Sequence, residues 1–330
     1  MKKIISYIKS EWKFLLITII IFCLLTIKLP YQIYGPGGKI DLNDRYTGEE
    51  YQSEGTLNVT YISAYPGTLP LLGLSYIIPN WDIVAENDIK YDNETTKAAI
   101  KRSRIMNDVA VSASTYLAYT KANKDFKITK VKEYITYIHE DAKTDLKIGD
   151  QLLSIDNQDI TLDFETDGYI KSKNLDDVIT FKVLRDNKEV ECHGTISTIS
   201  GEKLIGIGIH KVFEYDDSVK LKYNAKKNEL GPSGGLMMAL YVYNALTEED
   251  ITQGKDLYGT GTIELDGTVG EIDGIKYKLL GAYKKGAKYF IVPENNYEES
   301  IRVKEDNKLD IEIISVTTFD DALNKIKELK

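Results

Sequence analysis

Residues 231–246 read GPSGGLMMALYVYNAL, a glycine-rich turn followed at once by an uncharged and mostly apolar run. The run is long enough for a buried helix, so Ser233 is predicted at or just before a helix N-terminus. Backbone N–H groups and the positive end of the helix dipole gather there, which suits the oxyanion formed when a hydroxyl attacks a carbonyl. Gly231 and Gly234 would let a substrate backbone approach closely. The competing interpretation is a turn with an incidental N-cap serine.

A nucleophilic serine needs a base. The chain holds three histidines: His139, His193 and His210. The first two fall in a β-rich middle region, which leaves His210, or a lysine whose pKa is lowered by burial. Residues 275–282 carry an apolar stripe at i, i+3, i+4 and i+7 that includes Lys278, whereas Lys276 points about 200° away. A lysine in such a stripe is costly unless it functions or finds a partner, and the alternative is a lysine that extends from the stripe's edge to solvent.

Four motifs follow one another in the C-terminal third: GPSGG at 231–235, GTGTI at 259–263 with DGTVG at 266–270, GIKYKLLGA at 274–282, and GAKYFIVP at 286–293. This order resembles the proteolytic domain of Lon proteases and implies an α/β proteolytic domain over residues 199–330. The resemblance implies a Ser/Lys dyad, with Ser233 as nucleophile and Lys278 as general base. It also implies that the Thr260 hydroxyl lies near the lysine nitrogen; the alternative is an ordinary strand threonine. The chain departs from the family pattern at three positions: Leu230, Gly234 and Asp273.

Short alternating strands predominate between residues 130 and 198. Strands are predicted, with turn residues between them, at 134–138, 151–155, 178–183 and 189–193. The segment LKIGD at 146–150, followed by LLSIDN at 152–157, resembles the PDZ fold and implies a β-rich, peptide-binding domain. PDZ domains commonly bind an extended peptide as an added strand. The glycine-containing loop that would receive a terminal carboxylate is not evident before Tyr134.

Residues 31–129 form a further predicted α/β segment. The alternating stretch 56–63 predicts a strand, and the apolar spacing of 95–121 predicts helices that pack on a neighbour. If the strand belongs to the protease fold, the PDZ-like domain is an insertion; otherwise the domains follow one another along the chain. The predicted class is α+β, with an N-terminal transmembrane helix, a PDZ-like β-rich domain and a Lon-type α/β proteolytic domain.

Residues 14–27 read FLLITIIIFCLLTI and carry no charge. The run is shorter than the roughly 20 residues that a membrane-spanning helix needs, but flanking lysines can extend to the interfaces along their aliphatic stems. Residues 13–30 are therefore predicted to anchor the chain in a lipid bilayer. The lysines of residues 1–12 place this end in the cytoplasm and residues 31–330 outside. A cleaved signal peptide would need small residues at its end, and a buried core helix would leave the clustered lysines unexplained.

Composition excludes several function classes. The chain has 42 Lys and Arg against 51 Asp and Glu, a net charge of −9, which disfavours a nucleic-acid partner. Two cysteines, Cys23 and Cys192, exclude a disulfide scaffold and a multi-cysteine zinc site. No Gly-x-x-x-x-Gly-Lys-Ser/Thr phosphate loop occurs, so no nucleotide is expected as a partner. Neither a cofactor nor a metal is expected.

The whole chain resembles the membrane-anchored, PDZ-containing Lon-like proteases of bacteria. This resemblance implies an extracytoplasmic, ATP-independent serine endopeptidase that uses Ser233 and Lys278 to cleave secreted peptides or exposed segments of membrane and secreted proteins. One alternative is a catalytically inactive, membrane-tethered scaffold that binds peptides. Another is a Ser/Lys amidase acting on small molecules or cell-wall peptides. The sequence does not specify the substrate, and it leaves the oligomeric state open.

Overall fold

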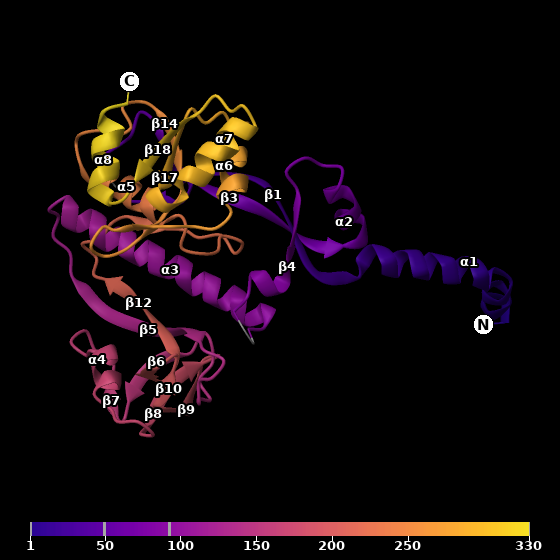
Figure 1. Ribbon diagram of the computed structural model, residues 1–330, viewed down its shortest axis with the longest axis horizontal. Coiled ribbons are helices and arrows are strands. Elements are labelled where there is room, and N and C mark those ends of the chain that lie inside the picture. Colours follow the sequence, from indigo (N-terminus) through magenta and orange to yellow (C-terminus); the bar gives the residue numbers. More distant parts are fainter. Residues whose placement is uncertain (1, 49–50, 92–93, 330) are drawn as a thin grey trace.

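The computed structural model describes residues 2–48, 51–91 and 94–329. Figure 1 shows a main α/β lobe that contains the C-terminus, a β-rich module below it, and an N-terminal helix that projects to one side. The chain builds part of the main lobe first, leaves it for the module, and returns for its C-terminal third.

A six-stranded mixed sheet forms the centre of the main lobe, in the order β18-β17-β14-β3-β1-β4. Its strands are β1 (Lys28–Asp41), β3 (Thr56–Thr68), β4 (Asp82–Ala85), β14 (Asp256–Gly259), β17 (Tyr289–Pro293) and β18 (Glu312–Val316). β14 pairs in parallel with both β17 and β3, so the predicted strand at 56–63 is part of the sheet that carries the C-terminal motifs. The β-rich module is therefore inserted between two paired strands of one sheet.

Helices cover both faces of this sheet. They are α5 (Gly235–Leu246), α6 (Ile275–Lys284), α7 (Tyr297–Asp306) and α8 (Phe319–Lys327). Successive residues of a strand point to opposite faces, so Leu257 and Ile291 pack with α5 and α8, whereas Tyr258 and Phe290 pack with α6 and α7. Burial on both faces explains why YFIVP is almost continuously apolar. The helix predicted after GPSGG is confirmed, as is the helical spacing of the apolar stripe at residues 275–282, which lies on α6.

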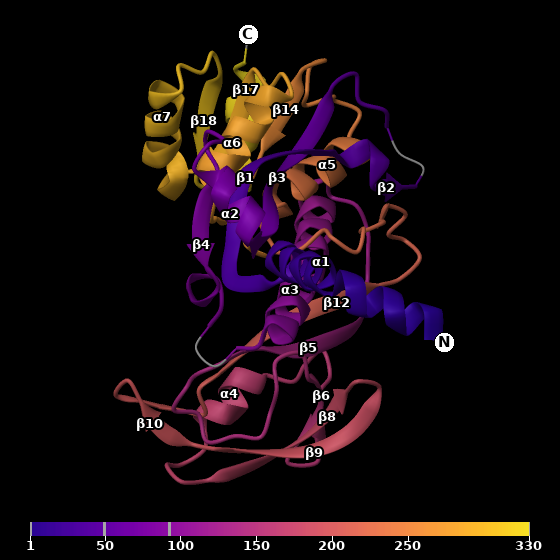
Figure 2. The same ribbon diagram turned by 90° about the vertical axis from the view of Figure 1, so that its right-hand side faces the viewer.

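One long helix, α3 (Thr96–Lys121), runs between the main lobe and the module (Figure 2). The side chain of Thr95 caps it by accepting a hydrogen bond from the Ala98 N–H at 3.2 Å. On one side α3 packs against α5. On the other, the Ser112 hydroxyl accepts a hydrogen bond of 2.8 Å from the Phe213 N–H. The helices predicted over residues 95–121 are thus one continuous helix that contacts both parts of the molecule.

The module is a sheet in the order β12-β5-β6-β8-β9, with β7 paired to β6. Its elements are β5 (Ile128–Ile138), β6 (Gln151–Ile155), β7 (Gln158–Asp159), α4 (Thr166–Lys171), β8 (Val178–Arg185), β9 (Lys188–Thr195) and β12 (Ile207–Tyr215). The four predicted strands are confirmed. β12 pairs antiparallel with β5 from Ile207 to Tyr215, so the sheet continues beyond the domain end predicted at residue 198. Ile207 and Ile209 pack on the module's core, which ties β12 to it.

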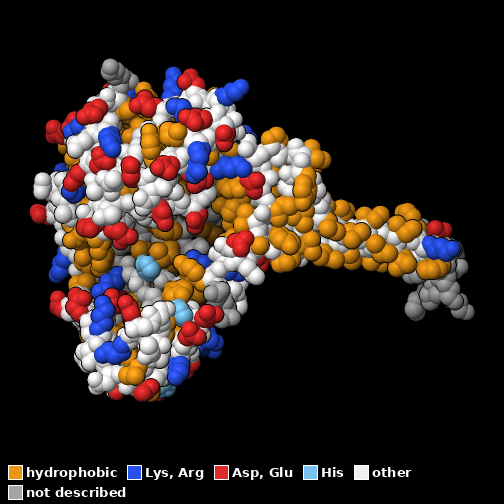
Figure 3. Space-filling model, in the orientation of Figure 1, with side chains coloured by type: hydrophobic (Ala, Val, Ile, Leu, Met, Phe, Trp, Pro, Cys, Tyr) orange, Lys and Arg blue, Asp and Glu red, His pale blue; other side chains and the backbone are white. Residues whose placement is uncertain are grey.

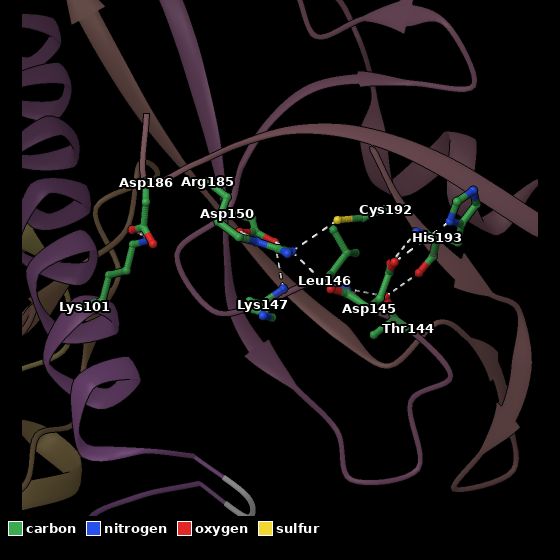
Figure 4. A network of polar contacts seen from close by, with 10 residues as sticks. All are labelled: Lys101, Thr144, Asp145, Leu146, Lys147, Asp150, Arg185, Asp186, Cys192 and His193. Atoms are coloured by element: carbon green, nitrogen blue, oxygen red, sulfur yellow. Dashed lines mark hydrogen bonds and ion pairs between the residues drawn. The ribbon is translucent and has the colours of Figure 1, made fainter. Parts of the chain in front are cut away.

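A buried ion pair holds the LKIGD segment (Figure 4). The solvent-inaccessible carboxylate of Asp150 accepts hydrogen bonds of 2.8 and 2.6 Å from the guanidinium of Arg185. Gly149 adopts φ +88°, a left-handed conformation that favours glycine. Next to Arg185, the carboxylate of Asp186 lies 3.6 Å from Nζ of Lys101 in α3. The segment that suggested a PDZ fold therefore has a structural role beside the contact with α3.

The N-terminal helix, α1 (Lys2–Thr26), projects away from the main lobe (Figures 1 and 3). Its apolar side chains from Phe14 onward are exposed. Judged on the described residues alone, none of the helices is long and apolar enough to cross a membrane. Lys28 begins β1 by pairing with Thr68, so residues 28–30 of the predicted anchor are strand and not helix.

α6 approaches β1 closely at Gly281. A Cβ added there would lie 2.7 Å from the carbonyl carbon of Gly37, a backbone atom that cannot rotate aside. Gly281→Ala is therefore expected to displace α6 and to lower the free energy of unfolding by about 1–3 kcal/mol, measured by urea denaturation. Gly73→Ala is the matched control, because no described atom beyond its chain neighbours and its own helix backbone lies within 4 Å of a Cβ added at Gly73. An equal loss of stability in both variants would contradict a close contact at Gly281.

Candidate active site

The GPSGG segment forms the turn that leads into α5. The Gly235 N–H donates to the carbonyl of Pro232 at 3.0 Å and closes the turn. Gly231 adopts φ +86°, which favours glycine, and its N–H donates to the carbonyl of Ser103 in α3 at 2.8 Å. Ser233 is partly buried and lies two residues before the start of α5. The structure thus places Ser233 just before a helix N-terminus, where the sequence predicts it.

The backbone N–H groups of Ser233 and Gly234 lie at this helix start. Within the described residues, no hydrogen bond engages either group. A Cβ added at Gly234 would lie 3.1 Å from the side chains of Val59 and Met238, so any larger residue at this position would crowd these two side chains. Two unused N–H groups beside the positive end of α5 are suited to holding an oxyanion.

Lys278 lies in the apolar layer under α6, and its side chain is only 4% exposed. Ile275 and Leu279, on the same face of the helix, are fully buried. Burial removes water from the ammonium form and lowers the pKa of Lys278 to about 7, while the carboxylate of Asp273 acts in the opposite direction. A substantial fraction of Lys278 is therefore neutral near pH 7, as a general base requires.

Thr260 links Lys278 to the serine segment. Nζ of Lys278 lies 3.0 Å from Oγ1 of Thr260, and that oxygen lies 3.0 Å from the carbonyl oxygen of Ser233. A carbonyl can only accept, so the threonine hydroxyl donates its hydrogen to Ser233 and accepts one from the lysine amine. The Gly261 N–H donates to the same carbonyl at 2.8 Å. The amine is thus oriented by a buried threonine that is itself fixed to the serine residue.

The remaining candidate bases lie elsewhere. Lys276, on another side of α6, donates a 2.6 Å hydrogen bond to Asp82 in β4. His210 lies on β12, where its Nδ1 is 2.6 Å from Oγ1 of Thr136. Within the described part of the chain, no hydrogen bond joins Lys276 or His210 to Ser233. Of these candidate bases, and judged on the described residues, Lys278 alone is connected to the serine, through Thr260 to the backbone carbonyl of Ser233.

Two sets of contacts around the site were not predicted. Asp82 accepts hydrogen bonds from Lys276 and, at 2.8 Å, from the hydroxyl of Tyr277, and so fixes the first turn of α6. In α3, the Ser114 hydroxyl lies 2.8 Å from the carbonyl oxygen of Gly235. Neither contact has a sequence motif, because both join segments more than a hundred residues apart.

Comparison with known proteins bears on the same part of the chain. Residues 217–328 match the Lon protease (S16) C-terminal proteolytic domain. The Lon protease of Campylobacter concisus (strain 13826) is 33% identical over 144 residues, which cover 43% of this chain and 18% of that protein. The Lon protease of Azospirillum brasilense is 39% identical over 93 residues, or 28% of this chain and 11% of that protein. The peroxisomal Lon protease homolog 2 of Caenorhabditis elegans is 30% identical over 162 residues, or 48% of this chain and 20% of that protein.

The chain thus spans a fifth or less of the length of these relatives. The matched region holds Ser233, Thr260 and Lys278, which the geometry brings together. The chain therefore contains a Lon protease (S16) C-terminal proteolytic domain, and this domain and its homologues support a serine peptidase.

Proposed function

We propose that the chain is an ATP-independent serine endopeptidase whose catalytic residues are Ser233 and Lys278. The observation that carries this proposal is the hydrogen-bonded series from Nζ of Lys278 through Oγ1 of Thr260 to the backbone carbonyl of Ser233, in which the lysine is 4% exposed. A buried amine with a pKa near 7 is a suitable base for a serine hydroxyl. The chain has no phosphate-loop motif, so we expect cleavage without nucleotide.

The proposed reaction has two halves. The neutral amine of Lys278 takes the proton of the Ser233 hydroxyl while Oγ bonds to the carbonyl carbon of the scissile peptide. The N–H groups of Ser233 and Gly234 hold the resulting oxyanion. The ammonium then returns the proton to the leaving amine as the C–N bond breaks, which leaves an acyl group on Ser233. Water, deprotonated by the same lysine, releases the acyl group and restores the serine.

We further propose that α1 anchors the chain in a membrane, with the N-terminus in the cytoplasm and the catalytic lobe outside. The exposed apolar side chains from Phe14 onward support this proposal, as do the lysines that precede them. The module's strand pattern supports a PDZ-like, peptide-binding role. Substrates would then be secreted peptides or flexible segments of membrane and secreted proteins.

The rate of cleavage is expected to depend on the protonation of Lys278. Because the base must be neutral, kcat/KM should rise with pH through about 7 and fall about tenfold for each pH unit below that value. Asp273→Asn removes the charge that raises the pKa, so its profile should shift to lower pH. Initial rates on a fluorogenic peptide between pH 5.5 and 9 provide the test. A flat profile, or no shift in the variant, would count against Lys278 as the base.

Thr260→Val keeps the shape of the side chain and removes the hydroxyl that orients the amine. We expect kcat to fall by about 10–100-fold with little change in KM, since the hydroxyl contacts the base and not the substrate. Thr260→Ser retains the hydroxyl and is expected to recover most of the rate. If the valine variant keeps the wild-type kcat while the serine variant loses it, the shape of the side chain and not its hydrogen bonding accounts for the role of Thr260.

The proposed function is tested with the full chain in lipid vesicles, without nucleotide. An unstructured protein and a mixed peptide library are the substrates, and a stably folded protein is the control. We expect cleavage of the first two, no cleavage of the third, and no change when ATP is added. Binding of peptides without cleavage would instead favour the inactive scaffold.

A further inference from the structure

An uncharged and exposed apolar surface lies beside the end of α1. The chain has no Asp, Glu, Lys, Arg or His from Thr56 to Trp81. Within this stretch we define the apolar tip as residues 62–81, which comprise the distal end of β3, the short helix α2 (Leu69–Ser75) and the turn after it. Tyr76 is 84% exposed and Ile77 76% exposed. Other exposed apolar residues of the tip are Tyr65, Leu69 and Leu74.

Strand register fixes the apolar tip next to the projecting helix. α1 ends at Thr26, and two residues later Lys28 pairs with Thr68, the residue that precedes α2. α1 contacts both α2 and β3. Figure 3 shows an apolar surface that runs without interruption from α1 onto this part of the molecule, while charged side chains are spread over the main lobe and the module.

The residues of the tip are those that a membrane interface favours. Tyrosine and tryptophan combine an apolar ring with a polar group, and they gather where the headgroups meet the acyl chains. Here Trp81 stacks on Tyr65 with ring centroids 5.1 Å apart. Large apolar patches are uncommon on soluble surfaces and indicate a binding partner. Because the tip has no charged group, its entry into the interface has no charge-desolvation cost.

We propose that the apolar tip lies in the bilayer interface and forms a second membrane contact beside α1. The inference rests on the proposed anchoring by α1: once this helix enters the bilayer, the Lys28–Thr68 pairing brings α2 to the same membrane surface. α1 leads into β1, and the apolar tip lies at the end of β3, which pairs with β1. Membrane contacts by both α1 and the tip would therefore restrict rotation at the junction between α1 and β1. The main lobe, and Ser233 within it, is then held in a set orientation to the membrane.

The two tryptophans of the chain, Trp12 and Trp81, report separately on α1 and on the tip. In the Trp12→Phe variant Trp81 is the only indole, and in Trp81→Phe only Trp12 remains. Each full-length variant is reconstituted in phosphatidylcholine vesicles, with or without bromine on the acyl carbons nearest the headgroup. We expect the Trp81 emission to fall by about half in brominated vesicles, since a ring at the interface lies within reach of these bromines.

Substitutions at the two most exposed residues test whether the tip itself holds Trp81 at the membrane. Added to Trp12→Phe, the pair Tyr76→Ser and Ile77→Ser should remove most of the quenching. The matched control carries Leu162→Ser and Val178→Ser, which change two exposed apolar residues of the module. It should leave the quenching of Trp81 unchanged. Added to Trp81→Phe, the tip substitutions should leave quenching of Trp12 unchanged.

Three outcomes distinguish this proposal from the anchoring on which it rests. Quenching of both tryptophans, with loss of the Trp81 effect only in the tip variant, supports it. Quenching of Trp12 but not of Trp81 overturns it and leaves the anchor intact. If Trp81 then becomes shielded from acrylamide as the protein concentration rises, the tip is assigned to a contact with a second copy of the chain. Quenching of neither overturns both proposals.

Discussion

Replacing Lys278 with methionine is expected to abolish peptide cleavage and, at the same time, to stabilise the fold. Methionine has a similar length and no charge, so it fills the same apolar site under α6. Without a base at Ser233, kcat/KM should fall by about 10³-fold or more. The variant should nevertheless unfold at a higher temperature, because a buried lysine that can be protonated is a cost to the folded state.

The pH dependence of stability identifies this cost. The pKa of Lys278 is about 7 in the folded protein and close to its ordinary value of 10.5 when unfolded, so between these values the unfolded chain binds one more proton. The free energy of unfolding therefore decreases as the pH falls from above 10 to 7, because protonation of Lys278 favours the unfolded chain. Between pH 9 and pH 7 the wild type should lose about 2–3 kcal/mol relative to Lys278→Met in urea denaturation.

Lys276→Met is the matched control for both measurements. Lys276 lies two residues away on the same helix but pairs with Asp82 at 2.6 Å, and no hydrogen bond among the described residues joins it to Ser233. Cleavage should stay within a few-fold of the wild type, and the pH dependence of stability should be unchanged. Loss of activity in Lys276→Met, or equal pH dependence of stability in Lys278→Met and wild type, would contradict the role assigned to Lys278.

Ser233→Ala is expected to lower kcat by at least about 10⁴-fold, because no covalent intermediate can form. The substitution removes one hydroxyl oxygen from a partly buried position and leaves the carbonyl, which holds Thr260 and Gly261, in place. The melting temperature should therefore change little. Peptide turnover and thermal unfolding of the same preparation provide the two readouts.

Ser103→Ala is the control for Ser233→Ala. Ser103 contacts the same turn, but through its backbone carbonyl, which accepts from the Gly231 N–H at 2.8 Å. Its side chain is not needed for that bond, so activity should be retained. A Ser233→Ala variant that still cleaves peptides at a tenth of the wild-type rate or more would exclude Ser233 as the nucleophile.

Local sequence patterns predict the elements around the site well. The apolar run after GPSGG and the stripe around Lys278 each specify a helix and the face that it buries, because side-chain periodicity reports burial directly. The same stripe separates Lys278 from Lys276, and the structure places Lys278 in the apolar layer and Lys276 beside Asp82.

Partners distant in sequence could not be predicted in the same way. Burial patterns do not state which strand a strand pairs with, so the parallel pairing of β3 with β14 and the continuation of the module's sheet into β12 became clear only from the fold. The close approach of Gly37 and Gly281 is of the same kind. A Cβ at Gly281 would lie 2.7 Å from the carbonyl carbon of Gly37, and one at Gly37 would lie 1.7 Å from the carbonyl oxygen of Tyr61 in β3, so each glycine is explained by a contact with a distant segment.

The most direct measurement is the position of the acyl group during turnover. The full chain in vesicles is mixed at pH 7.5 with a peptide nitrophenyl ester, quenched in acid within milliseconds to seconds, and examined by intact and tandem mass spectrometry. We predict one acyl group per chain, located on Ser233, absent from Ser233→Ala and formed much more slowly in Lys278→Met. An acyl group on another residue, or one that forms at an undiminished rate in Lys278→Met, would contradict a Ser233/Lys278 dyad.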